Sequence, residues 1–422
     1  MAFQGAKKIS QLLSFYCILT LFYSYNAVTV KKTLLRSSTR TRKRSPRSNR
    51  HEASIVEATS NDDRRAVTSE FVSKFEEIIK NEDNSNKTAK FAAILLKQGK
   101  IYCRLSQKDQ LFRDRGRYFV QMLKRGLKAQ RGELSFKHEL PILLKHDDSS
   151  GCNPASQTDA YQFPRLTWAV PVNNTPNQWC NVVGAPSYKM WRSLKQEMSW
   201  ESSFQRNEHL YPWSGKMKKA VWRGSTTSNR GLYGELQLNE TPRGQLVQKG
   251  KGVTTMDVAF HKLVGKYTEM EHTVATIKDP IPQEQMMKYK AIIDIDGNNW
   301  SARFNSLLCY NSVIVKIVPD FVESSFLELI PGVHYLPSSL ENVTQVVDFA
   351  IDEGNDARMR QIVANANSWC KENMIREKLA RSAVEAIQAY QVMLNDYDHH
   401  WNDDWHNSSV LDGIDDLVQC NL

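Results

Sequence analysis

The first 50 residues contain no Asp and no Glu, although they carry 11 Lys and Arg residues. The whole chain has 56 Lys and Arg against 46 Asp and Glu, so the 372 residues after the leader carry 45 basic and 46 acidic side chains. A protein that grips nucleic acid needs its basic residues on the folded surface. The balanced charge after residue 50 therefore argues against a nucleic-acid partner.

The chain also lacks any Cys-x-x-Cys pair and any cluster of Cys and His, which argues against a zinc site. No internal repeat is present. One of the seven cysteines, Cys17, lies in an apolar N-terminal segment. The other six can form up to three disulfides, whose pairing the sequence leaves open: Cys103, Cys152, Cys180, Cys309, Cys370 and Cys420.

The N-terminus contains 22 uncharged residues, 9–30, which as a helix would span about 33 Å, enough to cross a bilayer. We interpret it as a signal anchor after a short tail, 1–8. A cleaved signal peptide and an Arg/Ser-rich transit peptide remain alternatives, because basic residues also follow the segment. Residues 31–65 lack apolar periodicity and indicate a flexible basic stem.

From residue 66 onward, strand-like and helix-like patterns alternate, which predicts an α/β fold with parallel βαβ units. Expected strands cover 139–148, 166–172, 291–297 and 312–318, and residues 218–232 are expected to form a strand, a polar loop and the start of a helix. Helical periodicity marks 111–130 and a long closing helix, 376–394. A short helix is expected to begin between 298 and 302, with Arg303 one turn inside it.

The polar loop expected after the strand that begins at 218 reads Trp-Arg-Gly-Ser-Thr-Thr-Ser-Asn-Arg, residues 222–230. Small residues let backbone N–H groups approach an anion, hydroxyls donate hydrogen bonds, and two guanidinium groups flank the loop. This combination suits a diphosphate, although an ordinary surface turn has the same composition.

A second polar stretch, Asp-Ile-Asp-Gly, ends the strand at 291–297 and is followed by Arg303. Three interpretations of Asp294 and Asp296 compete. Both could bind a divalent cation, Asp294 could be the nucleophile of a haloacid dehalogenase-type phosphatase with Asp296 as its acid, or Asp296 could help position a ligand while Asp294 is structural. Asn298 stands where that phosphatase motif has Thr.

Together the two loops resemble glycosyltransferase family 90, the capsule-associated and Rumi-type protein O-glucosyltransferases. Residues 222–230 resemble the family's aromatic-Arg-Gly-Ser-x-Thr-Ser-x-x-Arg signature, and 289–317 resemble its Asp-Gly-x-x-x-Ser-x-Arg-Phe block. His334, Tyr335 and Pro337 match a His-Tyr-x-Pro segment. The resemblance covers roughly residues 100–395.

The resemblance implies an inverting enzyme of the GT-B fold, with two Rossmann-like domains and an interdomain cleft that holds a UDP-sugar without a metal. It would transfer glucose or xylose to a protein or polysaccharide hydroxyl. The N-terminal acceptor-side domain would cover 66–215, the C-terminal nucleotide-sugar domain 216–395, and a tail 396–422. Residues implied at the nucleotide-sugar site are Arg223, Gly224, Ser225, Thr227, Arg230, Asp296, Gly297, Asn299, Trp300, Ser301 and Arg303.

Inversion also needs a base for the acceptor hydroxyl. The stretch 106–119 aligns with the family segment that carries it and places Asp109 at the base position, with Phe112 and Arg115 following. Two family cysteines are replaced by Gln110 and Gly116. Asp114, Asp147 and Asp148 are the other candidates.

Possible N-glycosylation sites support a location in the Golgi or endoplasmic reticulum, with the catalytic part in the lumen. A catalytically inactive binding or adaptor protein of the same fold is the alternative from another class. The candidate asparagines are Asn86, Asn173, Asn239, Asn299, Asn342 and Asn407.

Overall fold

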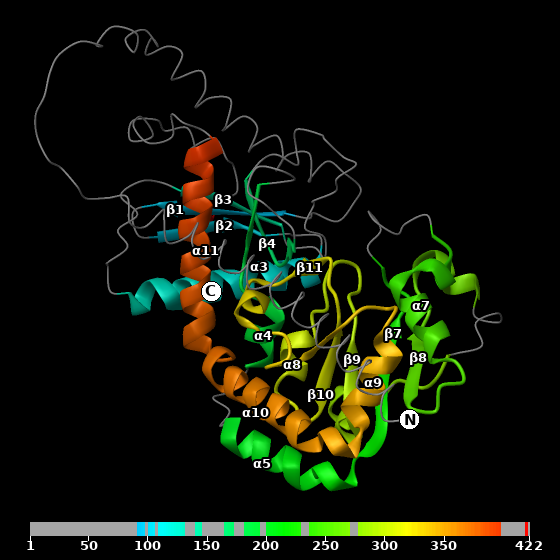
Figure 1. Ribbon diagram of the computed structural model, residues 1–422. Coiled ribbons are helices and arrows are strands. Elements are labelled where there is room, and N and C mark those ends of the chain that lie inside the picture. Colours follow the sequence, from blue (N-terminus) through cyan, green and yellow to red (C-terminus); the bar gives the residue numbers. More distant parts are fainter. Residues whose placement is uncertain are drawn as a thin grey trace, which may run out of the picture.

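The protein folds around two β-sheets (Figure 1). A computed structural model describes residues 91–97, 100–105, 109–130, 140–145, 164–172, 181–194, 200–228, 236–270, 277–397 and 418–420. The anticipated anchor and stem, and the C-terminal tail except for residues 396–397 and 418–420, lie outside these ranges, as do Arg230, Asp147, Asp148, Cys152 and Cys180. Among the described helices, none combines the length and apolar character needed to cross a bilayer.

The first sheet is mixed and has the order β13-β2-β1-β3-β4-β6. Strands β13, β2, β1 and β3 pair antiparallel, whereas β3, β4 and β6 pair parallel. The strands are β1 (Phe91–Lys97), β2 (Lys100–Arg104), β3 (Leu140–Lys145), β4 (Arg165–Thr167), β6 (Val182–Gly184) and β13 (Val418–Gln419).

The second sheet is parallel throughout and has the order β12-β10-β9-β7-β8. Its strands are almost continuously apolar, as expected for strands buried on both faces. They are β7 (Met217–Ser225), β8 (Met256–Lys262), β9 (Tyr289–Asp294), β10 (Val313–Ile317) and β12 (Leu336–Ser338). The predicted α/β class with parallel pairing is confirmed.

Helices cover both faces of the second sheet. On one face α7 (Pro242–Gly250) and α9 (Val343–Ile351) pack against Trp222, Phe260 and Val315. On the other face α8 (Phe304–Leu307) and the end of α10 (Asp356–Asn373) join a core that continues into the first sheet. The remaining helices are α3 (Gln110–Ala129), α4 (Tyr188–Ser193), α5 (Trp200–Leu210) and α11 (Arg376–Tyr397).

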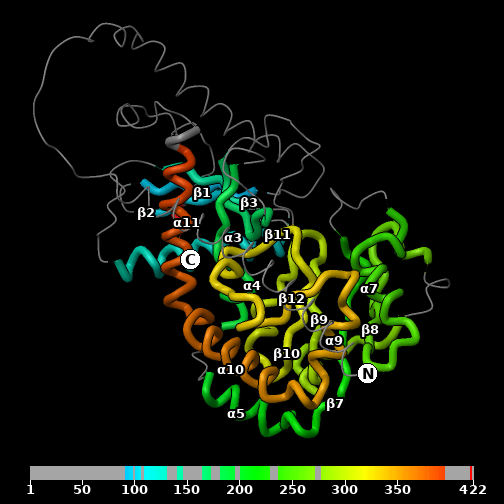
Figure 2. The backbone as a smooth tube through the Cα atoms, viewed as in Figure 1, coloured from blue at the N-terminus to red at the C-terminus, as the bar shows by residue number. Residues whose placement is uncertain are grey.

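The end of the chain returns to the first half. Figure 2 shows α11 running away from the second sheet and across α3, and the two helices pack together. β13 then pairs with β2, and a disulfide joins Cys103 to Cys420. A second disulfide joins Cys309 to Cys370. A short pair, β5 (Val170–Pro171) with β11 (Phe321–Val322), links the two halves at another point.

Two details differ from the sequence-based expectations. The strand expected at 166–172 is divided into β4 and β5, because Trp168 turns into the core between Phe119 and Tyr188. The helix expected from residue 298 is only α8, with Arg303 before its first residue. Trp168 and Trp213 are core residues.

Candidate functional site

The two polar loops lie at adjacent strand ends of the second sheet. From β7 the chain moves outward to β8 and then returns across the sheet to β9, which pairs with the other side of β7. In open parallel sheets, ligands bind at such a reversal of strand order, beyond the carboxyl ends of the strands. The loops after β7 and β9 meet at this point, where Arg303 donates to the backbone carbonyl of Arg223.

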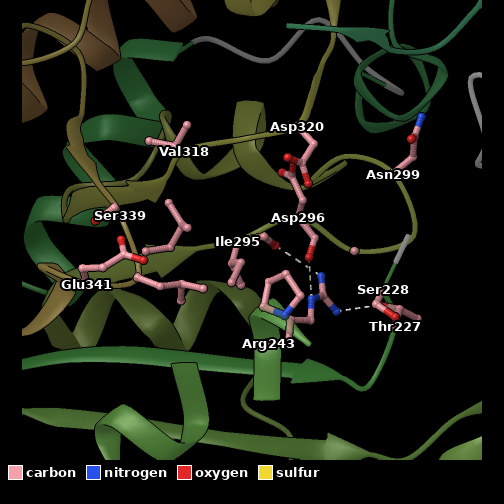
Figure 3. A pocket seen from close by; sticks show the side chains of 14 residues that line it. Thr227, Ser228, Arg243, Ile295, Asp296, Asn299, Val318, Asp320, Ser339 and Glu341 are labelled. Atoms are coloured by element: carbon pink, nitrogen blue, oxygen red, sulfur yellow. Dashed lines mark hydrogen bonds between the residues drawn. The ribbon is translucent and has the colours of Figure 1, made fainter. Parts of the chain in front are cut away.

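Arg243, near the start of α7, joins these loops. Its Nη1 donates to the Thr227 hydroxyl at 2.6 Å and to the Ser225 carbonyl at 2.9 Å. Its Nε donates to the Asp296 carbonyl at 2.7 Å and its Nη2 to that of Ile295 at 3.3 Å (Figure 3). Burial, together with the charge of Arg303, lowers the pKa of Arg243 to about 10, so it remains a cation at neutral pH.

A cavity of about 390 Å³ opens where the loops meet, and we call it the cationic pocket. The described residues that line it include no Asp or Glu. Lys189 reaches it from α4 in the first half of the chain, and His261 from β8. The remaining lining residues are Arg223, Gly224, Ser225, Thr227, Arg243, Gly297, Asn298, Asn299, Trp300, Ser301, Ala302 and Arg303.

Arg223 and Arg303 both line this pocket and are in direct contact. Nη1 of Arg303 donates to the backbone carbonyl of Arg223 at 2.9 Å. Arg223 is 6% exposed and forms a 2.9 Å ion pair with Asp257 of β8. Both guanidinium groups are therefore fixed by the protein, and their charge is preorganised for an anion.

Glycines allow the loops to pack closely. A Cβ at Gly224 would lie 2.4 Å from the ring of Trp222, and one at Gly297 would lie 3.0 Å from Nη2 of Arg243 and 3.2 Å from the Thr227 hydroxyl. The Trp-Arg-Gly order in the first motif is thus a packing requirement as well as a chemical one.

Asp294 is a structural anion beneath the pocket. Its carboxylate is fully buried and accepts hydrogen bonds from Ser301 at 2.6 Å, Lys316 at 2.9 Å and Arg303 at 3.3 Å. Burial alone would raise the pKa of Asp294, but the charges of Lys316 and Arg303 hold it below its ordinary value. Such enclosure disfavours a role as a phosphatase nucleophile.

Lys316 pairs with Asp296 as well as with Asp294, and the Nζ of Lys316 lies 2.7 Å from Oδ1 of Asp296. Burial raises the pKa of Asp296, and the neighbouring carboxylates of Asp294 and Asp320 add to this effect. Because Lys316 already bridges Asp294 and Asp296, the positive charge that a divalent cation would supply comes from the protein. Within the described ranges, no group of three or more His, Cys, Asp or Glu side chains could hold a metal ion.

The second loop is also held by a hydrogen bond from Trp300 to Glu323. The Trp300 indole N–H donates to Glu323 at 2.8 Å, and Asn305 also donates to this carboxylate. Burial raises the pKa of Glu323 to about 7. Asn299 is 3% exposed, so the possible glycosylation site at this residue is excluded in the folded protein.

A second pocket of about 200 Å³ lies next to the cationic pocket, and we call it the strand-end pocket (Figure 3). It shares Thr227, Arg243, Gly297 and Asn299 with the cationic pocket and extends along the ends of β9, β10 and β12. Its walls combine apolar and acidic side chains: Pro242, Ile295, Ile317, Val318 and Leu340, with Asp296, Asp320 and Glu341.

Asp109 lies apart from these loops in sequence, at the start of α3. Its Oδ1 accepts from the backbone N–H groups of Leu111 at 2.8 Å and Phe112 at 3.2 Å, so it caps the helix. It is not among the side chains that line the two pockets. Asp114 is half-buried and accepts a hydrogen bond from Gln110 within α3.

Sequence reasoning singled out neither Arg243 nor His261 nor Lys189 as site residues. Arg243 follows Pro242 at a helix start, and Thr241 accepts from Gly244 N as the cap. A Thr-Pro-Arg helix start behind a phosphate-type loop is the signal that could have found it.

Comparison with known proteins identifies the family of the chain. The family model "Glycosyl transferase family 90" matches residues 69–402, which is most of the chain. The protein therefore belongs to glycosyltransferase family 90.

Two individual proteins are similar to parts of the chain. Protein O-glucosyltransferase 2 of Danio rerio is 25% identical over 190 residues, which are 43% of this chain and 36% of that protein. The match thus spans about a third of the relative's length. The N-terminal domain of Candida albicans trehalose-6-phosphate phosphatase overlaps 51% of this chain and 52% of its own, with 11% identity and a TM-score of 0.27, too low to compare the folds.

Proposed function

We propose that this glycosyltransferase uses a UDP-sugar, glucose or xylose being the transferred residue, and inverts the anomeric centre. The observation that carries the proposal is the cationic pocket at the reversal point of the parallel sheet. Arg223, Arg243 and Arg303 line this pocket, and no acidic side chain does among its described lining residues. A nucleotide diphosphate bound there would supply the negative charge that complements them.

The strand-end pocket would bind the nucleoside and so fix the orientation of the donor. Its apolar walls suit a planar base, and its carboxylates can accept hydrogen bonds from the two hydroxyls of a ribose. The shared residues Thr227 and Arg243 then lie between nucleoside and diphosphate. The sugar would extend toward Lys189 and the first half of the chain, where a GT-B enzyme has its acceptor side.

In this arrangement the main catalytic contribution is electrostatic. Negative charge develops on the diphosphate as the bond to the sugar breaks, and fixed cations stabilise it without reorganising. Asp109 would accept the proton of the attacking hydroxyl on a protein or polysaccharide acceptor. We propose no metal requirement, because Lys316 and Arg303 already form ion pairs with Asp294, and Lys316 also with Asp296.

The experiment is release of UDP and transfer of sugar from UDP-glucose and UDP-xylose, with protein and glycan acceptors, in the presence and absence of EDTA. Arg303→Ala should lower kcat/KM by about 10²-fold. Arg206→Ala, an exposed arginine paired with Glu284 on the surface, is the matched control. Donor binding without turnover under any condition would support an inactive binding protein instead, and loss of activity in EDTA would refute the metal-free proposal.

Asp109→Asn tests the base. Asparagine caps a helix about as well as aspartate, so thermal stability should stay close to that of the wild type. kcat should fall by about 10²- to 10⁴-fold, because the amide does not accept the proton. If Asp114→Asn shows this loss and Asp109→Asn does not, the assignment moves to Asp114.

We propose a location on the luminal side of the secretory pathway. The two disulfides support it, because such bonds persist in oxidising compartments. Protease protection in sealed microsomes tests both this proposal and the predicted N-terminal anchor. Digestion of the catalytic part in intact vesicles would contradict it.

A further inference from the structure

His261 occupies an irregular position in the sheet that brings it into the cationic pocket. Gly224 of β7 pairs with Phe260, but the next residue, Ser225, pairs with Lys262, so β8 carries one extra residue at His261. Bulges of this kind redirect a side chain and are frequent beside active sites. Phe260 remains in the core against Trp222, while His261 is exposed and lines the pocket.

The arginines of the pocket have already committed most of their N–H groups. Arg223 donates to Asp257 and to two backbone carbonyls, and Arg243 donates to four oxygens of the loops. Arg303 donates to Asp294 and to the carbonyls of Arg223 and Ile293. These residues supply charge, but a ligand oxygen also needs donors that can turn toward it.

The imidazole of His261 is such a group, and its charge depends on what the pocket holds. Burial and the cations that face it lower the pKa of His261 below its ordinary value of 6.5, so it is neutral at pH 7. Those cations are Arg303 after β9, Arg243 on α7, Lys262 on β8 and Arg223 on β7. Lys189 on α4 lines the same pocket, and Asp257, on the same strand as His261, is a counter-charge paired with Arg223.

We propose that the pocket takes up a proton on His261 together with its anionic ligand. The two negative charges of a diphosphate offset the repulsion from the cations and offer the imidazolium an acceptor. The inference rests on the proposed function, because it assigns His261 as a further donor-binding residue of the same site. Affinity should therefore rise as pH falls through the pKa of the ligand-bound state, by up to about tenfold per pH unit within that window.

Calorimetric titration with UDP-glucose and UDP-xylose tests the proton directly. Both phosphates of these esters stay ionised, so protons taken up at pH 7 belong to the protein. Observed heats in PIPES, HEPES and Tris should vary with the ionisation enthalpy of the buffer and give uptake of a fraction of one proton. His261→Gln should abolish the uptake and weaken binding most at pH 6.

Two further variants sharpen the result. His261→Lys keeps a permanent cation and should bind with an affinity that no longer depends on pH between 6 and 8. His209→Gln, an exposed histidine on α5 outside both pockets, should behave as the wild type. If the donors bind without proton uptake and His261→Gln changes nothing, the inference is wrong while the proposed function stands. If neither donor binds, the proposed function fails and this inference fails with it.

Discussion

Arg243 shows how one side chain can hold a site without being part of either loop. Its guanidinium bonds reach Ser225 and Thr227 on one side and Ile295 and Asp296 on the other. It also lies over the ring of Trp222, 5.6 Å from the ring centroid. A planar fork of donors suits this bridging, whereas a point charge does not.

Variants of Arg243 should therefore show whether this residue acts by holding the two loops in place or by its positive charge alone. We expect Arg243→Ala to reduce kcat/KM for the donor by about 10²-fold and to lower the melting temperature, because both loops lose their shared partner. Arg243→Lys should recover only a small part of the activity. Steady-state kinetics and thermal unfolding check this, and full recovery by Lys would mean that charge alone matters.

Gly224→Ala should destabilise the fold by about 1–3 kcal/mol, because the new methyl group would overlap the ring of Trp222. Denaturant unfolding measures the loss. Gly215→Ala is the matched control, since its Cβ would lie 3.6 Å from Pro212, an ordinary contact. Equal stability of the two variants would show that the indole moves easily.

At the scale of elements, β7 and β8 are joined by charge as well as by backbone hydrogen bonds. Asp257 accepts from Arg223, Lys278 and Tyr289. Burial alone would raise its pKa, but these hydrogen bonds and the Arg223 charge lower it to about 2. A carboxylate with a lowered folded-state pKa stabilises the protein above its ordinary pKa of 3.8, and this contribution disappears as pH falls to about 2.

Asp257→Asn should therefore cost stability near neutral pH, and its difference from the wild type should shrink as the pH falls below 4. Urea unfolding from pH 6 to pH 3 measures that difference. Glu353→Gln, which removes an exposed partner of Lys218, is the control and should change stability little at any pH. A constant Asp257→Asn difference across the range would contradict the lowered pKa.

Three strands of the second sheet, β7, β9 and β10, were predicted from their apolar runs with polar ends, whereas β8 and β12 were not. The length of α8 was not predictable. Residues 298–303 have helix-compatible composition, but Ser301 and Arg303 are bound to Asp294 and Trp300 to Glu323. These tertiary contacts hold the segment as a loop.

Only those site residues that lie within the two sequence motifs could be predicted from the sequence. Arg223, Ser225, Thr227, Gly297 and Arg303 lie together as expected. Arg243 is separated from the first motif along the chain, and the bulge that redirects His261 depends on the register of β7 with β8. Neither spacing nor composition encodes these relations.

At the scale of the whole molecule, the two halves share one continuous hydrophobic core, and the disulfide Cys103–Cys420 closes a sequence separation of 317 residues. Cys420→Ser should lower stability by about 2–5 kcal/mol. It should also expose the end of the chain to limited proteolysis. Lys262→Gln, an exposed change far from the disulfide, should leave the proteolytic pattern unaltered, and identical digestion of Cys420→Ser would show that β13 holds without the bond.

The pairing of β13 with β2 also has a consequence for biosynthesis. Among the described strands, only β13 covers the outer edge of β2, so that edge stays open until residues 418–419 have left the ribosome. A nascent chain in this condition is prone to aggregate and depends on chaperones. Maturation of the amino-terminal half should therefore wait until residues 418–419 have emerged.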